Sequence, residues 1–149
     1  MSAEANKAVI RRYVDELNRR NLAILEELIA EKVISGSLFP ELEADETISR
    51  ETYKGQILQR ITAFPDYHVA IEQVVAEGDW VALFWTSRWT HSQEYMGVPP
   101  TGKLLKGTAV SIYRIAEGQI VEVRGYWDRA ELWQQLGLIP STEQILGQA

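Results

Sequence analysis

The pattern of apolar and polar positions changes once along the chain, from a helical period to alternation. In the first part, apolar residues recur every three or four positions over residues 5–20, 22–30 and 49–63. This spacing puts apolar side chains on one side of a helix, so it predicts three helices. Only a few residues join the first two, so we expect them to pack as a hairpin. Residues 33–39 fit a short strand or the entry to a loop, and residues 40–47 predict an irregular acidic segment.

In the second part, apolar and polar residues alternate over residues 67–76, 80–90, 104–116 and 119–127, which predicts four strands. Gly78 and Gly118 lie in turn signals between neighbouring strands. Asp128 and Glu131 have the spacing of a capping box, which predicts a last helix to Leu136. Helices followed by a meander of long strands predict one α+β domain over residues 1–149.

Strand parity separates an inward face from an outward face. We expect the faces rich in tryptophan to point inward, and a bulge would reverse part of this assignment. In the strand over residues 80–90, the inward face ends at His91. The inward sets are Val81, Leu83, Trp85, Ser87, Trp89 and His91, then Ala109, Ser111 and Tyr113, then Val121, Val123, Gly125 and Trp127.

Composition narrows the classes of partner and chemistry. Hydrophobic residues make up 46% and charged residues 24%, as in an ordinary globular domain. The net charge of −6 argues against nucleic acid or an anionic membrane as a partner. The absence of cysteine excludes disulfides and thiolate chemistry. Without an apolar signal core or a membrane-length apolar run, we expect a cytoplasmic protein.

Three stretches resemble one known family. They are residues 64–68 (Phe-Pro-Asp-Tyr-His), residues 91–102 with Met-Gly-Val-Pro-Pro-Thr-Gly, and residues 113–137 with Tyr-Trp-Asp and Leu-Trp-Gln-Gln-Leu-Gly. Together they are similar to the SnoaL-like polyketide cyclases, a branch of the nuclear transport factor 2-like superfamily. The resemblance implies a cone-shaped fold, in which N-terminal helices pack on a strongly bent antiparallel sheet.

The resemblance also implies a homodimer, with an apolar cavity in each subunit. Characterised members close rings by intramolecular aldol condensation, without a metal or a cofactor. Their acid/base is an aspartate on the last strand, and this chain has Gly125 there. A histidine of the preceding strand is replaced by Ser111. The aldol machinery is therefore not carried over, and His91 is the most transferable polar residue.

His91 fits two roles equally well. It can transfer a proton or donate a hydrogen bond to a ligand, or it can close the following turn through a backbone carbonyl. Asp128 fits a catalytic acid, but its spacing to Glu131 favours a helix cap. His68 is favoured as a strand-edge residue. Nothing supports a metal site formed by the two histidines.

The aromatic residues of the inward faces predict a small-molecule pocket. Tyr13 of the first helix is expected to point into the same space. The predicted pocket residues are Tyr13, Leu83, Trp85, Trp89, Ser111, Tyr113, Gly125 and Trp127.

Three functions follow, in decreasing order of support. The first is a cofactor-independent cyclase or isomerase, in which His91 moves a proton on an apolar carbonyl compound. The second is a dimer that binds an apolar ligand without chemistry. The third is epoxide or ester hydrolysis, as in the related limonene epoxide hydrolase, which relies on inward Asp, Arg and Asp groups that these faces lack. We expect the homodimer to form through the outer sheet face, which carries Phe84, Val110, Ile112 and Tyr126.

Overall fold

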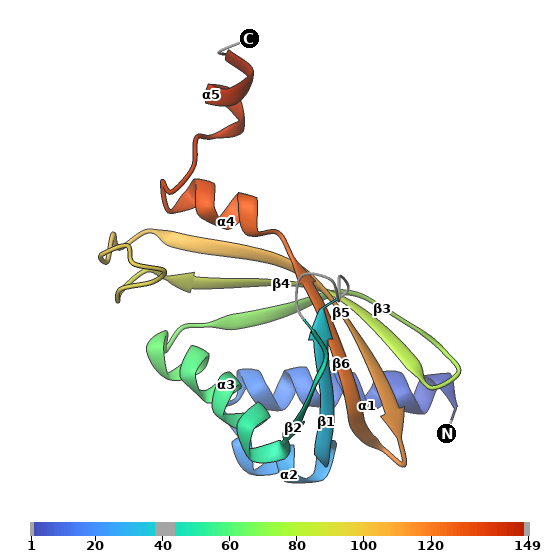
Figure 1. Cartoon of the computed structure of the whole chain (residues 1–149). Coiled ribbons are helices and arrows are strands. Elements are labelled where there is room, and N and C mark those ends of the chain that lie inside the picture. The colour runs from blue at the N-terminus through green and yellow to red at the C-terminus, as the bar shows by residue number, and fades with distance from the viewer. Residues whose placement is uncertain (1, 38–43, 148–149) are drawn as a thin grey trace.

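The computed structural model describes residues 2–37 and 44–147 (Figure 1). The helical elements are α1 (Ala3–Asn18), the short 3-10 turn η1 (Leu22–Ile24), α2 (Leu25–Leu28), α3 (Arg50–Ala63), α4 (Arg129–Gln135) and α5 (Thr142–Gly147). The strands are β1 (Ile29–Ser37), β2 (Glu46–Ser49), β3 (His68–Glu77), β4 (Trp80–Thr90), β5 (Leu104–Ala116) and β6 (Gln119–Trp127). Helices against one curved sheet confirm the predicted α+β class.

The six strands form one open sheet in the order β2-β1-β6-β5-β4-β3. Every neighbouring pair is antiparallel except β1 and β6, which are parallel. The expectation of an antiparallel sheet is therefore wrong for this pair, and the sheet is mixed. A parallel pair needs a crossover connection, and here α3 and four strands lie between the two partners in sequence.

Helix α1 is fixed against the sheet by its apolar side and by its C-terminal end. Ile10, Val14 and Leu17 are buried, and the Ser2 hydroxyl caps the first turn by accepting from the Ala5 amide. At the other end, the Asn18 side chain donates to the Val69 carbonyl at 2.8 Å and accepts from its amide at 2.9 Å. These contacts therefore fix the position of α1 over β3 and β4.

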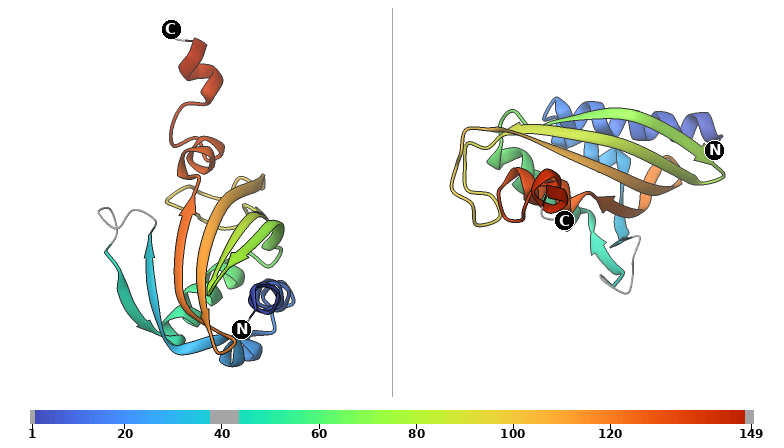
Figure 2. Two further views of the ribbon diagram at one scale, coloured as in Figure 1. Left: turned by 90° about the vertical axis from the view of Figure 1, so that its right-hand side faces the viewer. Right: turned by 90° about the horizontal axis from the view of Figure 1, so that it is seen from above.

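Helix α3 begins where the sequence predicts. The Ser49 hydroxyl accepts from the Thr52 amide at 3.0 Å, and Tyr53, Ile57 and Ile61 form the buried side. Figures 1 and 2 show α1 and α3 on the same side of the curved sheet. Helices α4 and α5 follow β6 and lie at the other end of the sheet from α1 and α3.

The predicted second helix, over residues 22–30, is too long. The structure has η1 and α2, and β1 begins at Ile29 because Ile29 and Val33 are fully buried along the sheet. The alternative of a strand over residues 33–39 is confirmed for its described part. The segment expected to be irregular, residues 40–47, contains the start of β2, and residues 38–43 lie outside the described residues. The patterning did not predict α5.

Strands β4, β5 and β6 have the predicted bounds. One bulge, in β6, changes which of its residues point inward. Ile115 pairs with Ile120, but Arg114 pairs with Glu122, so β6 has an extra residue at this point. Ile120 is consequently fully buried, whereas parity had placed it outward with Val121 inward. In the part of the chain that the structure describes, no helix is both long enough and apolar enough to cross a membrane.

Candidate functional site

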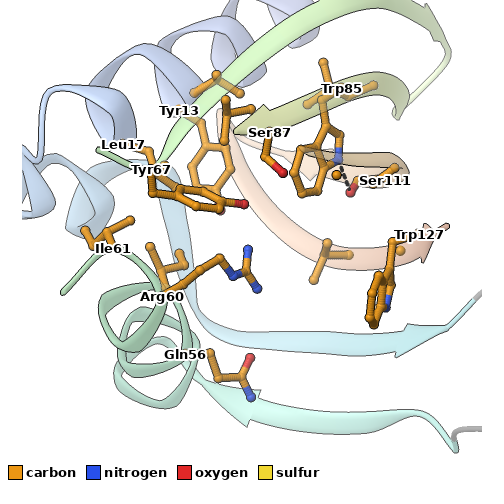
Figure 3. Close-up of a pocket in the computed structure, with 18 of the residues that line it drawn as sticks. Tyr13, Leu17, Gln56, Arg60, Ile61, Tyr67, Trp85, Ser87, Ser111 and Trp127 are labelled. Carbon is orange, nitrogen blue, oxygen red and sulfur yellow. Dashed lines mark hydrogen bonds between the residues drawn. The ribbon is translucent and has the colours of Figure 1, made fainter. Parts of the chain in front are cut away.

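A cavity of about 400 Å³ lies between α1, α3 and the concave side of the sheet (Figure 3). Its lining is mainly apolar and aromatic, with a few polar groups directed into the same space. All eight predicted pocket residues belong to this lining: Tyr13, Leu83, Trp85, Trp89, Ser111, Tyr113, Gly125 and Trp127. Such a cavity is the usual form of a small-molecule site.

His91 is fully buried but does not belong to the lining. Its Nδ1 lies 2.9 Å from the Thr101 hydroxyl and its Nε2 lies 3.2 Å from the Val98 carbonyl oxygen. A carbonyl only accepts, so Nε2 carries a hydrogen and donates it to Val98, while Nδ1 is hydrogen-bonded to the Thr101 hydroxyl. Both ring nitrogens are thus used inside the turn. This geometry supports the turn-closing role, and proton transfer by His91 stays a prediction.

The turn that His91 closes carries part of the cavity wall. Tyr95 and Val98 exchange two backbone hydrogen bonds within it, at 3.1 and 2.9 Å. The Tyr95 ring then packs on Trp89, with centroids 5.7 Å apart, and on Phe64 at 5.6 Å. His91 therefore contributes to the cavity indirectly, because it holds the turn that places Tyr95.

Two tyrosines form a buried hydroxyl pair at the helical side of the cavity. The hydroxyl oxygens of Tyr13 on α1 and Tyr53 on α3 lie 3.1 Å apart. Burial, then the electrostatic interaction with Tyr53 and the hydrogen bond to it, raises the pKa of Tyr13 well above the ordinary value. Burial likewise raises the pKa of Tyr53 and of Tyr113. These phenols are neutral near pH 7, so they can donate hydrogen bonds but cannot act as bases.

On the sheet side, small residues leave room beside one hydrogen-bonded pair. The Trp85 indole nitrogen donates to the Ser111 hydroxyl at 2.9 Å (Figure 3). A side chain at Gly125 would begin 4.0 Å from that hydroxyl, which is ordinary contact distance. The space opposite Ser111 is therefore open.

Sequence reasoning missed Arg60. It points from α3 into the cavity, and its guanidinium carbon lies 6.0 Å from the centre of the Tyr67 ring (Figure 3). Within the described lining, Arg60 is the one cationic side chain, and no carboxylate or histidine accompanies it. Helical spacing could have identified Arg60. It is seven residues after Tyr53 and three after Ile57, so it lies on the same side of α3 as these two residues.

Asp128 and His68 have the roles that the sequence favoured. The Asp128 carboxylate accepts from the Glu131 amide at 2.9 Å, which caps α4, and it lies outside the cavity lining. His68 is exposed at the start of β3. Among the residues that the structure describes, no three side chains of the metal-binding types are placed to hold an ion.

The outer sheet face combines exposed apolar groups with ion pairs. Phe84 is 38% exposed and Tyr126 is 51% exposed. Beside them, Glu122 is buried and accepts from Arg114 at 3.0 Å and from Arg124 at 2.9 Å. This mixture fits an interface between subunits, and the homodimer stays a prediction.

Comparison with known proteins gives a family and a fold. The family model described as SnoaL-like polyketide cyclase matches residues 7–136. No curated protein matches the chain.

Three solved structures are among the similar ones. AclR, a proposed hydroxylase from Streptomyces galilaeus, has a TM-score of 0.82 at 26% identity and covers 99% of this chain and 90% of its own. A proposed polyketide cyclase from Acidithiobacillus ferrooxidans has a TM-score of 0.78 at 25% identity, with 93% and 99% coverage. IdmH, a proposed polyketide cyclase from Streptomyces antibioticus, has a TM-score of 0.76 at 30% identity, with 89% and 98% coverage. These matches confirm the expected fold.

Proposed function

Because the chain belongs to the SnoaL-like polyketide cyclase family, we propose that its cavity binds a largely apolar carbonyl compound of the polyketide type and promotes its ring closure or isomerisation without a cofactor. The observation that carries this proposal is the cavity itself. It is about 400 Å³ in volume and mainly apolar, and its described lining directs a few neutral donors and one cation into it. A ligand with several rings and a few oxygens would fit both its size and its chemistry.

Ring closure of this kind joins a carbon beside one carbonyl to the carbon of a second carbonyl. The C–H bond of the first carbon breaks, its proton passes to water, and its electron pair forms the new C–C bond. The π bond of the attacked carbonyl breaks at the same time, and its oxygen takes up a proton from water. The cavity can fold the chain and hydrogen-bond its oxygens through Arg60, the Tyr13–Tyr53 pair and Ser111. Orientation and charge stabilisation are the contributions that this lining supports.

A second candidate is binding without chemistry. It is favoured by the described lining, which contains no carboxylate or histidine that could accept the proton from carbon. Under this alternative, the same ligands bind but leave the protein unchanged.

A linear triketone with a terminal phenyl ring separates the two functions. Its aldol closure and dehydration give a phenyl-substituted resorcinol, with the loss of one water that mass spectrometry detects. A cyclase accelerates this loss over a protein-free control, and His68→Ala keeps the rate because His68 lies outside the cavity lining. Tight binding of the triketone with no acceleration would establish the binding function. No binding and no acceleration would contradict both.

The proposed functional unit is a homodimer formed through the outer sheet face. The exposed rings of Phe84 and Tyr126 support it, because a sheet face without covering helices gains from burying such groups. Sedimentation of the Phe84→Glu variant tests this. We expect the wild type to sediment as a dimer and the variant as a monomer, and a monomeric wild type at micromolar concentration would contradict the proposal.

A further inference from the structure

Arg60 lies in the cavity without a carboxylate to balance its charge. No Asp or Glu of the described residues forms an ion pair with it, whereas Arg50, Arg114 and Arg124 each have at least one. The titratable groups that face Arg60 are all phenols, contributed by the neighbouring elements and turns: Tyr13, Tyr53, Tyr67, Tyr95 and Tyr113.

Four of these phenols do not neutralise the guanidinium. Burial raises the pKa of Tyr13, Tyr53, Tyr95 and Tyr113, so these four are uncharged near pH 7. Solvent instead hydrates the guanidinium, because Arg60 and Gln56 line the cavity and are both exposed. A ligand that enters displaces part of this solvent. A neutral ligand would leave the cation poorly solvated, whereas an anionic ligand would supply the missing counter-charge.

We propose that the cavity binds its carbonyl ligand as an ionised enol or phenol, with the anionic oxygen beside the Arg60 guanidinium. This inference rests on the proposed function, since a compound with neighbouring carbonyl groups ionises as an enol. It adds a ligand class, namely acidic oxygen compounds such as 1,3-dicarbonyls and phenols, and it assigns Arg60 as the residue that selects them.

The step is an ionisation with solvent as the proton acceptor. The O–H bond of the enol or phenol breaks, its electron pair stays on the oxygen, and the proton passes to water at the open mouth. No protein base is required, which agrees with a described lining that contains no carboxylate or histidine. An enolate formed in this way is already the nucleophile that ring closure needs.

Umbelliferone and its methyl ether form a matched pair of probes. Both are aromatic carbonyl compounds, but only umbelliferone has an acidic hydroxyl, and its neutral and ionised forms absorb at different wavelengths. We expect wild-type protein to lower the pKa of bound umbelliferone by about one unit or more, which is at least about tenfold tighter binding of the anion. The methyl ether measures binding that does not depend on ionisation.

Three variants locate the effect. Arg60→Gln should abolish the shift while the methyl ether still binds, and Arg60→Lys should restore part of the shift because the charge returns. Arg88→Gln removes a similar charge from the exposed outer face and should leave the shift intact. Circular dichroism verifies that each variant is folded.

The results separate this inference from the proposed function. An unshifted pKa in wild type, or a shift that persists in Arg60→Gln, would overturn the inference. If the methyl ether binds in that case, the proposed small-molecule cavity stands without charge selection. If neither probe binds, the proposed function is contradicted and the inference fails with it.

Discussion

The two faces of strand β6 differ in whether their charged side chains have oppositely charged partners. On the outer face, Glu122 lies between Arg114 and Arg124, and Arg124 also pairs with Asp45 at 2.7 Å. On the inner face, Gly125 and its neighbours border a cavity whose described lining has a single cation and no carboxylate. The outer charges are balanced by the fold, whereas the inner charge is left for solvent or a ligand.

This contrast separates residues that stabilise the fold from residues that are available for function. A buried carboxylate between two arginines is costly to remove, because Arg114 and Arg124 both lose their ion pair with it. A cation at a solvent-exposed mouth can be removed at little cost to the fold. Stability and ligand binding should therefore respond to different substitutions.

The largest stability effect is expected for Glu122→Gln on the outer face. It leaves two arginines without their shared partner, so we expect a loss of about 3 kcal/mol in the free energy of unfolding. Arg60→Gln on the inner face should change this free energy by less than about 0.5 kcal/mol. Urea unfolding of both variants tests the contrast, and equal losses would show that Arg60 is also a structural charge.

The next effect is expected for His91→Gln. Glutamine cannot satisfy both hydrogen bonds of the buried imidazole, so we expect a loss of about 2 kcal/mol and weaker binding through displacement of Tyr95. If His91 instead transfers a proton, the variant would keep its affinity and lose a factor on the order of 10²–10⁴ in turnover of the triketone. Melting temperature, affinity and rate measured together distinguish these roles.

Alkaline pH should destabilise the fold through the inner phenols. In the unfolded chain, Tyr13 ionises near its ordinary pKa of about 10, but burial keeps it neutral in the folded state. Stability is thus fully present below pH 10 and falls above it, by about 1.4 kcal/mol per pH unit for each such phenol. Urea unfolding at pH 9 and pH 11 should show a smaller drop for Tyr13→Phe than for wild type. An identical drop would refute this assignment.

A smaller loss is expected for Asp128→Ala. Removal of this helix cap should cost about 1 kcal/mol and leave turnover unchanged. A variant that keeps its melting temperature but loses turnover would identify Asp128 as a catalytic acid.

Local patterning predicted the bounds of the long strands well, but it did not predict where β1 begins or how it pairs. Strands β4, β5 and β6 have long alternating runs between turn signals, so their bounds follow from sequence. The start of β1 at Ile29 does not, because a short apolar run fits a helix or a strand. The parallel pairing of β1 with β6 and the bulge before Glu122 depend on contacts between distant segments.

The cavity was predictable in its aromatic wall but not in its charge. Parity placed Trp85, Trp89 and Ser111 inward, and all three belong to the lining. Arg60 was missed because a charged residue on a weakly amphipathic helix is ordinarily assigned to the solvent side. His91 has inward parity, yet its ring is used by the following turn, which parity cannot show.

The most direct measurement of the central claim is ligand affinity after the cavity is filled. Gly125→Leu places a side chain in the open space opposite Ser111, and Gly55→Leu adds the same group where no atom lies within 4 Å. If the cavity is the ligand site, titration should show at least about tenfold weaker binding of the umbelliferone methyl ether to Gly125→Leu, without a lower melting temperature, and wild-type affinity in Gly55→Leu. Equal affinity in the two variants would contradict the assignment of the cavity as the ligand site.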